Sequence, residues 1–161
     1  MAQWRKKEQD ETYTPEEIEA RLKEELPNWN YENGWIRRKY KTSGWKATLM
    51  VVNTVGHLAE AGWHHPDLTV SYAFVIVKLM NHAAKGIREK DFDLANKIEE
   101  VIMWQPGIDN ESALEGTPDD QRFKYLKYDK SRVQSPDFPP VFLSSLISEI
   151  DIPRSTALHI S

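Results

Sequence analysis

The strongest limit on the fold comes from Leu68–Met80, where apolar side chains occupy both sides of an extended chain. One face would carry Ala73, Val75, Val77 and Leu79, and the other Tyr72, Phe74, Ile76 and Met80. Folded proteins cover such a strand on both sides. We therefore expect helices on one face, and a partner subunit or the C-terminal residues on the other.

A first helix is predicted close to the N-terminus. Thr14 can cap this helix, Pro15 suits its first position, and Pro27 cannot continue it. Apolar residues recur four positions apart along it and predict a single narrow buried stripe, formed by Ile18, Leu22 and Leu26.

A β-hairpin is predicted over Asn28–Thr42, because Asn33-Gly34 is a strong signal for a two-residue turn between strands. Its second arm is basic and carries Arg37, Arg38, Lys39 and Lys41. Basic and aromatic side chains on one strand could bind nucleic acid, but the chain has a net charge of −4. We therefore favour a solvated strand face and expect no nucleic-acid partner.

Two more helices flank the apolar segment. The longer one, Ser43–Gly62, would be capped by Thr42 or Ser43 and would end at Gly62. Its expected buried face consists of Trp45, Leu49, Val52, Val55, Leu58 and Ala59. The other helix, Glu89–Trp104, follows a turn at Lys85-Gly86.

This order of elements predicts an α+β domain, in which a small antiparallel sheet has its helices on one face. Three strands can be assigned, and a fourth would lie within Arg5–Tyr13 or at an unrecognised turn. We expect a flexible segment over residues 1–13, the domain over 14–104 and a C-terminal extension over 105–161. Within the extension, Arg122–Arg132 would form a short strand or clamp. A short amphipathic helix over Phe138–Ile150 would cover the open face of the sheet.

Composition excludes several classes of protein. There is no cysteine, so disulfides and thiolate chemistry are ruled out. No apolar run approaches the roughly 18 residues of a membrane span, and the first residues lack the apolar core of a signal peptide. A cytoplasmic location with no membrane association is therefore expected.

Residues 60–91 hold the groups best suited to chemistry. Two carboxylates and three imidazoles fall within this stretch, namely Glu60, His64, His65, His82 and Asp91. Pro66 favours an extended His65, so the adjacent imidazoles would point to opposite sides of the chain. Such groups can transfer protons near neutral pH.

With Pro66 and Tyr72 these residues form the pattern Glu60-x3-His64-His65-Pro66-x5-Tyr72-x9-His82-x8-Asp91. The pattern resembles the signature of the pterin-4a-carbinolamine dehydratases, and the resemblance extends over Thr14–Trp104. It implies a four-stranded antiparallel sheet and a homodimer or homotetramer. It also implies a lyase of tetrahydrobiopterin biosynthesis, which removes water from a 4a-hydroxytetrahydropterin to give a quinonoid dihydropterin without any cofactor or metal.

The same resemblance implies roles for the site residues. His64, His65 and His82 would be catalytic: His64 and His82 as the acid/base pair, and His65 as the residue that contacts or orients the pterin. Glu60 and Asp91 would fix imidazole tautomers or bind the pterin ring.

Two residues depart from the family pattern, and one alternative function stays open. Trp63 stands where relatives often have a small or acidic residue, and would wall or narrow the pocket as a substrate-binding residue. Lys90 replaces a frequent arginine, and Tyr72 suits a packing role.

A metal site is the weaker interpretation, because this order of ligands matches no common zinc spacing. The alternative function is a non-catalytic binding module, either an assembly factor for a carboxylase such as RuBisCO or a dimerisation cofactor in transcription, with the extension contacting a protein partner.

Overall fold

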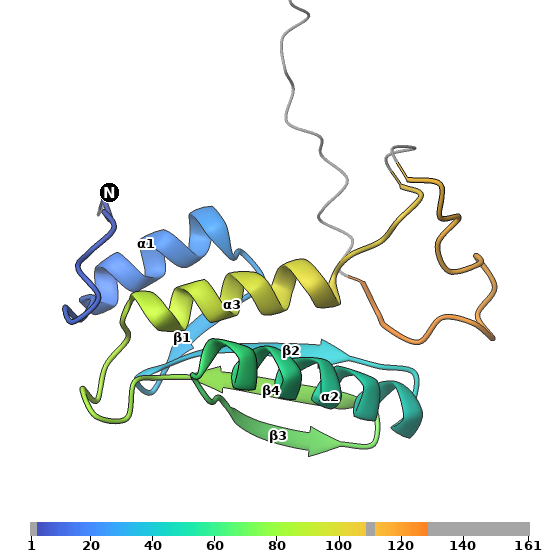
Figure 1. Ribbon diagram of the computed structural model, residues 1–161, viewed down its shortest axis with the longest axis horizontal. Coiled ribbons are helices and arrows are strands. Elements are labelled where there is room, and N and C mark those ends of the chain that lie inside the picture. The colour runs from blue at the N-terminus through green and yellow to red at the C-terminus, as the bar shows by residue number, and fades with distance from the viewer. Residues whose placement is uncertain (1–2, 109–111, 129–161) are drawn as a thin grey trace, which may run out of the picture. The chain divides into compact units, whose positions relative to one another are not determined.

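The computed structural model describes residues 3–108 and 112–128. Within them lie three helices and a four-stranded antiparallel sheet (Figure 1). The elements follow the order α1 (Pro15–Glu25), β1 (Asn30–Glu32), β2 (Trp35–Lys41), α2 (Trp45–Gly62), β3 (Asp67–Ser71), β4 (Phe74–Leu79) and α3 (Glu89–Ile102). The predicted α+β class is confirmed. The expected helix over Phe138–Ile150 lies outside the described residues.

The sheet has the strand order β1-β2-β4-β3, so β2 and β4 are its central strands. Alternate residues of these two strands point toward the helices. They form one core with helical side chains, including Ile36, Tyr40, Val75, Val77 and Leu79 from the sheet and Ile18, Leu22, Val55, Phe92 and Ile98 from the helices. The Asn33-Gly34 turn joins β1 to β2 as predicted, with positive φ at both residues.

The segment Leu68–Met80 is not one strand, and this prediction was wrong. It forms a hairpin in which β3 pairs with β4 through a turn at Tyr72 and Ala73. Helix α2 and the end of β2 hold this turn in place: the Thr48 hydroxyl donates to the Tyr72 carbonyl at 3.0 Å, and the Thr42 amide donates to the Ala73 carbonyl at 2.9 Å. The fourth strand arises because an unrecognised turn divides this segment into two strands, which was one of the two positions expected for it.

The cap of helix α2 also differs from the prediction. Gly44 is the N-cap residue, and no side chain caps the helix, because Thr42 and Thr48 share a hydrogen bond of 2.7 Å instead. A side chain at position 44 would be strained, since its φ is 155° and the Tyr72 hydroxyl lies 3.3 Å from where a Cβ would stand.

The buried face of α2 is rotated relative to the predicted one. Its buried residues are Ala47, Thr48, Val51, Val55 and Ala59. Trp45 and Leu49, which were expected in the core, are exposed, as is Met50. The amphipathic period was correct, but the apolar residues of α2 extend beyond the face that the domain covers.

The outer face of the sheet, opposite the helices, carries basic side chains whose charges have nearby partners. Arg37 pairs with Glu32, Lys78 lies 4.0 Å from Asp67, and Lys39 lies over the ring of Phe74. These contacts agree with the expected solvated strand face. Arg38 differs from its neighbours because it is buried on the helical side, where its Nε donates to Glu99.

Part of the C-terminal extension packs on the domain. Leu126 is buried and forms an antiparallel bridge with Thr42, just beyond the end of β2. Two backbone hydrogen bonds flank the bridge, from Ser43 to Tyr125 at 3.0 Å and from Lys127 to Lys41 at 2.9 Å. This short pairing lies within the segment Arg122–Arg132, for which a short strand or clamp was predicted, and residues 129–132 of that segment lie outside the described residues.

Candidate functional site

Several connecting segments meet at one end of the sheet, and they carry the residues singled out from the sequence (Figure 1). Because Asp67 pairs with Lys78, β3 begins beside the end of β4. Helix α2 ends just before β3, and α3 begins after the loop that follows β4. The last turn of α2, the α2–β3 connection, the loop after β4 and the first turn of α3 are thereby placed at the same end.

His64 and Asp91 form the tightest contact of this region. The imidazole Nε2 lies 2.7 Å from Asp91 Oδ1, the His64 side chain is 14% exposed, and Asp91 is completely buried. The other carboxylate oxygen of Asp91 accepts a hydrogen bond of 2.8 Å from the Arg88 amide. With both oxygens engaged, the carboxylate has a fixed orientation. A carboxylate that accepts from Nε2–H leaves Nδ1 of the same ring free to take a proton.

His65 makes the corresponding contact with Glu60, but at the surface. Its Nε2 lies 3.1 Å from Glu60 Oε2, and the two side chains are 55% and 68% exposed. Water competes for such a pair, so it orients the imidazole less firmly than Asp91 orients His64.

Trp63 is the C-cap of α2, a role that the sequence assigned to Gly62. It adopts the left-handed conformation, with φ 48° and ψ 43°, and its amide caps the helix by donating to carbonyls in the last turn. Its ring lies edge-on to His65, with 5.4 Å between centroids. A non-glycine residue in this conformation costs about 1–2 kcal/mol. Strain of this kind is often found at functional sites.

His82 lies in the loop after β4 and is exposed. Its ring makes an edge contact with Trp35, at 5.5 Å between centroids and 73° between planes. Trp35 is a neighbour of this candidate site residue that the sequence reasoning missed. It directly follows the Asn33-Gly34 turn, but its approach to His82 depends on the pairing of β2 with β4, which local patterns do not reveal.

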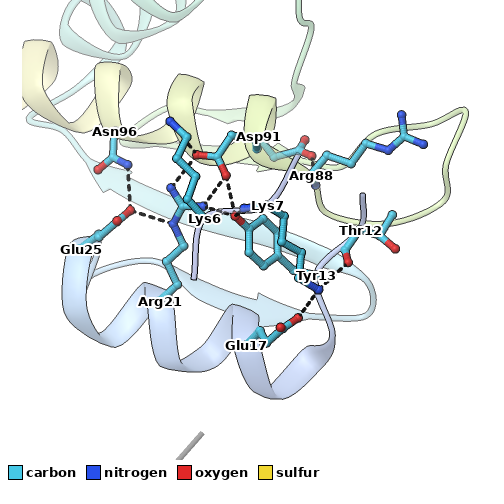
Figure 2. A network of polar contacts seen from close by, with 11 residues as sticks. Lys6, Lys7, Thr12, Tyr13, Glu17, Arg21, Glu25, Arg88, Asp91 and Asn96 are labelled. Atoms are coloured by element: carbon cyan, nitrogen blue, oxygen red, sulfur yellow. Dashed lines mark hydrogen bonds and ion pairs between the residues drawn. The ribbon is translucent and has the colours of Figure 1, made fainter. Parts of the chain in front are cut away.

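The first turn of α3 is anchored from its other side by a buried polar network (Figure 2). Arg21 of α1 donates two hydrogen bonds to Glu89, of 2.8 and 2.9 Å, and the Tyr13 hydroxyl donates to the same carboxylate at 2.5 Å. Lys6 lies 3.5 Å from Glu89. Glu89 and Asp91 share one helical turn, so the network that holds Glu89 also fixes the backbone that presents Asp91 to His64.

The charges of this network shift the pKa of two of its members. Burial disfavours the ionised form of Glu89, but hydrogen bonds from Arg21 and Tyr13, together with the charges of Arg21 and Lys6, lower its pKa to about 2. Burial, followed by the hydrogen bond to Glu89, raises the pKa of Tyr13 to about 12. Both groups therefore keep their ordinary neutral-pH forms far into acid and alkali.

Tyr72 of the pattern, together with Lys90 and His57 outside it, lies apart from these contacts. Tyr72 is in the β3–β4 turn against Gly44, next to the start of α2. Lys90 is exposed on α3, and His57 is exposed on α2. His159 lies outside the described residues.

No described part of the chain offers a ready metal site or a membrane span. Within residues 3–108 and 112–128, no three His, Asp or Glu side chains are grouped so that they could hold a metal ion. Over the same residues, no helix has the length and apolar character needed to cross a membrane.

Comparison with known families gives a clear match over this domain. The family model described as Pterin 4 alpha carbinolamine dehydratase matches residues 11–101. The chain belongs to this family. The pterin dehydratase match ends before the extension, so residues 105–161 lie outside it.

Relatives and a solved structure agree with the pterin dehydratase family. An Aquifex aeolicus protein named "Putative pterin-4-alpha-carbinolamine dehydratase" is 46% identical over 87 residues, which cover 54% of this chain and 87% of that protein. A protein of the same name from Chloroflexus aurantiacus is 40% identical over 91 residues, or 55% of this chain and 98% of that one. The crystal structure of a transcriptional coactivator/pterin dehydratase from Brucella melitensis is 25% identical, with a TM-score of 0.53 over 56% of this chain and 98% of that chain.

Proposed function

We propose that the protein is a lyase that removes water from a 4a-hydroxytetrahydropterin and releases a quinonoid dihydropterin. The observation that carries this proposal is the His64–Asp91 pair: a largely buried imidazole held at 2.7 Å by a fully buried carboxylate. A surface histidine with no chemical task does not need a partner of this kind. Membership of the pterin dehydratase family supplies the substrate class.

The reaction needs two proton movements and no electron acceptor. The bond between C4a and its hydroxyl breaks, and the departing oxygen takes a proton from an imidazole N–H and leaves as water. The proton on N5 passes to a second imidazole, and the double bond between N5 and C4a forms. Histidine suits both steps because its unperturbed pKa is about 6.5.

We assign these steps to His64 and His82, with His65 binding and orienting the pterin. His64 has the firmer support for its orientation, through Asp91. His65 is exposed at the surface beside the Glu60 carboxylate and the Trp63 ring, an arrangement that suits a residue that binds substrate. Glu60, Trp63 and Asp91 are assigned to substrate binding or to the orientation of the histidines.

The proposal is tested by a dehydratase assay on the purified full chain, with each stereoisomer of the 4a-hydroxyl supplied separately. His64→Ala and His82→Ala should each lower kcat by about 10²–10⁴-fold, and His65→Ala should mainly raise KM. Separate stereoisomers are needed because a different acid on each face would hide half of each defect in a mixture. A wild-type protein that is inactive on both isomers would refute the proposal.

The exposed apolar residues of α2 favour a second candidate, a protein-binding role. Trp45, Leu49 and Met50 stand on a helix whose other face is in the core. Exposed apolar groups on one helix suit an interface, and the Brucella melitensis protein is described as a transcriptional coactivator as well as a dehydratase. We propose that this face serves first for pairing with further copies of the chain. Analytical ultracentrifugation of Leu49→Glu against wild type tests it, and the expected result is a smaller particle. If the wild-type protein had no dehydratase activity and Leu49→Glu did not change its oligomeric state, this face would instead suit a protein other than a second copy of the chain.

A further inference from the structure

Trp35 links β2 to His82, the one proposed catalytic residue in the loop after β4. Trp35 begins β2, and the next residue, Ile36, pairs with Leu79 at the end of β4. Ile36 is buried on the helical side, so Trp35 lies on the opposite, outer side of the sheet. From there its ring meets the ring of His82 at 5.5 Å and 73°.

The three histidines differ in what orients their rings. His64 has Asp91, and His65 has Glu60 and Trp63. Among the contacts of the described chain, the aromatic ring of Trp35 takes this part for His82. The backbone around His82 has its own support, because the Asn81 amide donates to the Gly86 carbonyl at 3.0 Å and the Ala84 amide donates to the Asn81 side chain at 2.9 Å. The loop therefore fixes where the side chain starts, and Trp35 limits where the ring can turn.

Trp35 is itself held by the sheet. The Lys78 ammonium lies 5.1 Å from the centre of its ring, and Lys78 also approaches Asp67 at 4.0 Å. Lys78 is paired with Arg37 on one side and Asp67 on the other, so its position is set by the central strands. The paired strands β2 and β4 thus support the Trp35 ring, which contacts His82 in the loop after β4.

We propose that Trp35 is a positioning residue that holds the His82 imidazole in the orientation needed for proton transfer, an inference that rests on the dehydratase function proposed above. An edge contact between aromatic rings restricts the angle between them. Proton transfer depends on that angle, and small misplacements of reacting groups are costly. Trp35 acts through His82, because its indole N–H is only a hydrogen-bond donor and does not act as an acid or base near neutral pH.

The kinetic test compares Trp35→Ala, Trp35→Phe and the control Phe74→Ala in the full chain. Trp35→Ala should lower kcat by about 10–10²-fold with little change in KM. Trp35→Phe should restore much of the loss, because phenylalanine can make the same edge contact. Phe74 is the matched control, because it lies on the same outer face of the sheet and has the Lys39 ammonium 4.0 Å from the centre of its ring. Phe74 is far from His82, since it pairs with Lys41 at the opposite end of β2 from Trp35. Phe74→Ala should leave kcat unchanged.

A double-mutant cycle tests whether Trp35 acts through His82. In a His82→Ala background, Trp35→Ala should change kcat by less than about twofold, because the group that it positions is already absent. In a His65→Ala background it should keep its full effect. Equal losses in both backgrounds would mean that Trp35 acts on the substrate or on the fold, and would overturn the inference.

A spectroscopic measurement tests the contact without relying on turnover. The ring protons of His82, assigned by their loss in His82→Ala, should carry a ring-current shift in the wild-type NMR spectrum. In Trp35→Ala they should move toward the positions of the exposed His57, and in Trp35→Phe they should stay displaced. Unmoved signals, or a wild-type kcat in Trp35→Ala, overturn this inference alone. A wild-type protein without activity overturns the proposed function together with it.

Discussion

Asp91 fixes more of the proposed site than any other single residue. It is fully buried, and its two oxygens contact His64 and the Arg88 amide. A buried carboxylate with both oxygens engaged cannot rotate without losing a hydrogen bond that water does not replace. The orientation of His64 is therefore set by the start of α3.

Replacing Asp91 by Asn should separate orientation from folding. The amide keeps the size of the side chain but presents a donor where one oxygen was, so it favours the wrong tautomer of His64. We expect kcat to fall by about 10²-fold or more, with far-ultraviolet circular dichroism unchanged. Asp93→Asn is the matched control, because Asp93 is an exposed neighbour on the same helix. Equal activity of the two variants would contradict the role given to Asp91.

Trp63 allows strain and binding to be measured at one position. Trp63→Gly removes the strain of the left-handed conformation, but glycine also gives the unfolded chain more conformational entropy. The net result should be a stabilisation of about 0.5–1 kcal/mol. Few contacts are lost, since the side chain is 76% exposed. The same variant should raise KM, because His65 loses its ring partner.

Trp63→Ala completes that comparison. Alanine keeps the Cβ and therefore the strain, so it should raise KM to the same extent without the gain in stability. Urea denaturation and steady-state kinetics on both variants give the two readouts. If Trp63→Gly proved less stable than Trp63→Ala, the strain at this cap would be absent.

The two hairpins of the sheet show which elements the sequence could predict. Asn33 and Gly34 adopt positive φ themselves, so the β1–β2 turn is encoded by the residues that form it. The β3–β4 turn at Tyr72 and Ala73 has no glycine, proline or asparagine, and it is held by Thr42 and Thr48 from other elements. Its formation depends on tertiary contacts, which a local pattern cannot display.

The candidate site divides in the same way. The residue types and spacing predicted which histidines and carboxylates to consider. The sequence could not say that Asp91 contacts His64, because that pairing depends on how α2 and α3 pack. The contact between Glu60 and His65 depends on the path of the chain just after the end of α2. Trp35 was missed because it reaches His82 across two paired strands.

Leu126 should make the extension matter to the stability of the domain. Leu126 is buried, and it forms a β-bridge with Thr42, far earlier in the sequence and just beyond the end of β2. Leu126→Ala should lower the free energy of unfolding by about 2–3 kcal/mol, as expected for a buried leucine. Leu114→Ala, at an exposed position of the same extension, should change it by no more than about 0.5 kcal/mol. Chemical denaturation of both variants is the measurement, and equal effects would mean that Leu126 adds nothing to the core.

For the molecule as a whole, the Glu89 network contributes to the response of stability to acid. The pKa of Glu89 is about 2 in the folded chain and has an ordinary value of 4.5. A group with a lowered folded pKa stabilises fully above its unfolded value, and its contribution is lost as the pH falls toward the folded one. We therefore expect a loss of about 3 kcal/mol between pH 4.5 and 2 from this residue.

Glu89→Gln should be less stable than wild type at neutral pH, but it should lose less stability on acidification. Glu100→Gln, exposed on the same helix, is the control and should behave as wild type.

In alkali the stability depends on Tyr13, whose pKa is raised from 10.0 to about 12. The contribution of Tyr13 to stability is therefore lost as the pH rises through that interval. Denaturation midpoints across both intervals test the signs. An acid response of Glu89→Gln as steep as that of wild type would exclude Glu89 as its source.

The bridge between Thr42 and Leu126 also bears on how the chain folds as it leaves the ribosome. The seven helices and strands found in residues 3–108 and 112–128 are synthesised before Leu126, at about 5–20 residues per second, and domains begin to fold as they emerge. The corner between β2 and α2 is therefore made before the segment that pairs with it, and until then Thr42 lacks its bridge partner. A nascent chain stalled before Leu126 should therefore expose this corner to chaperones and proteases, and release of the extension should close it.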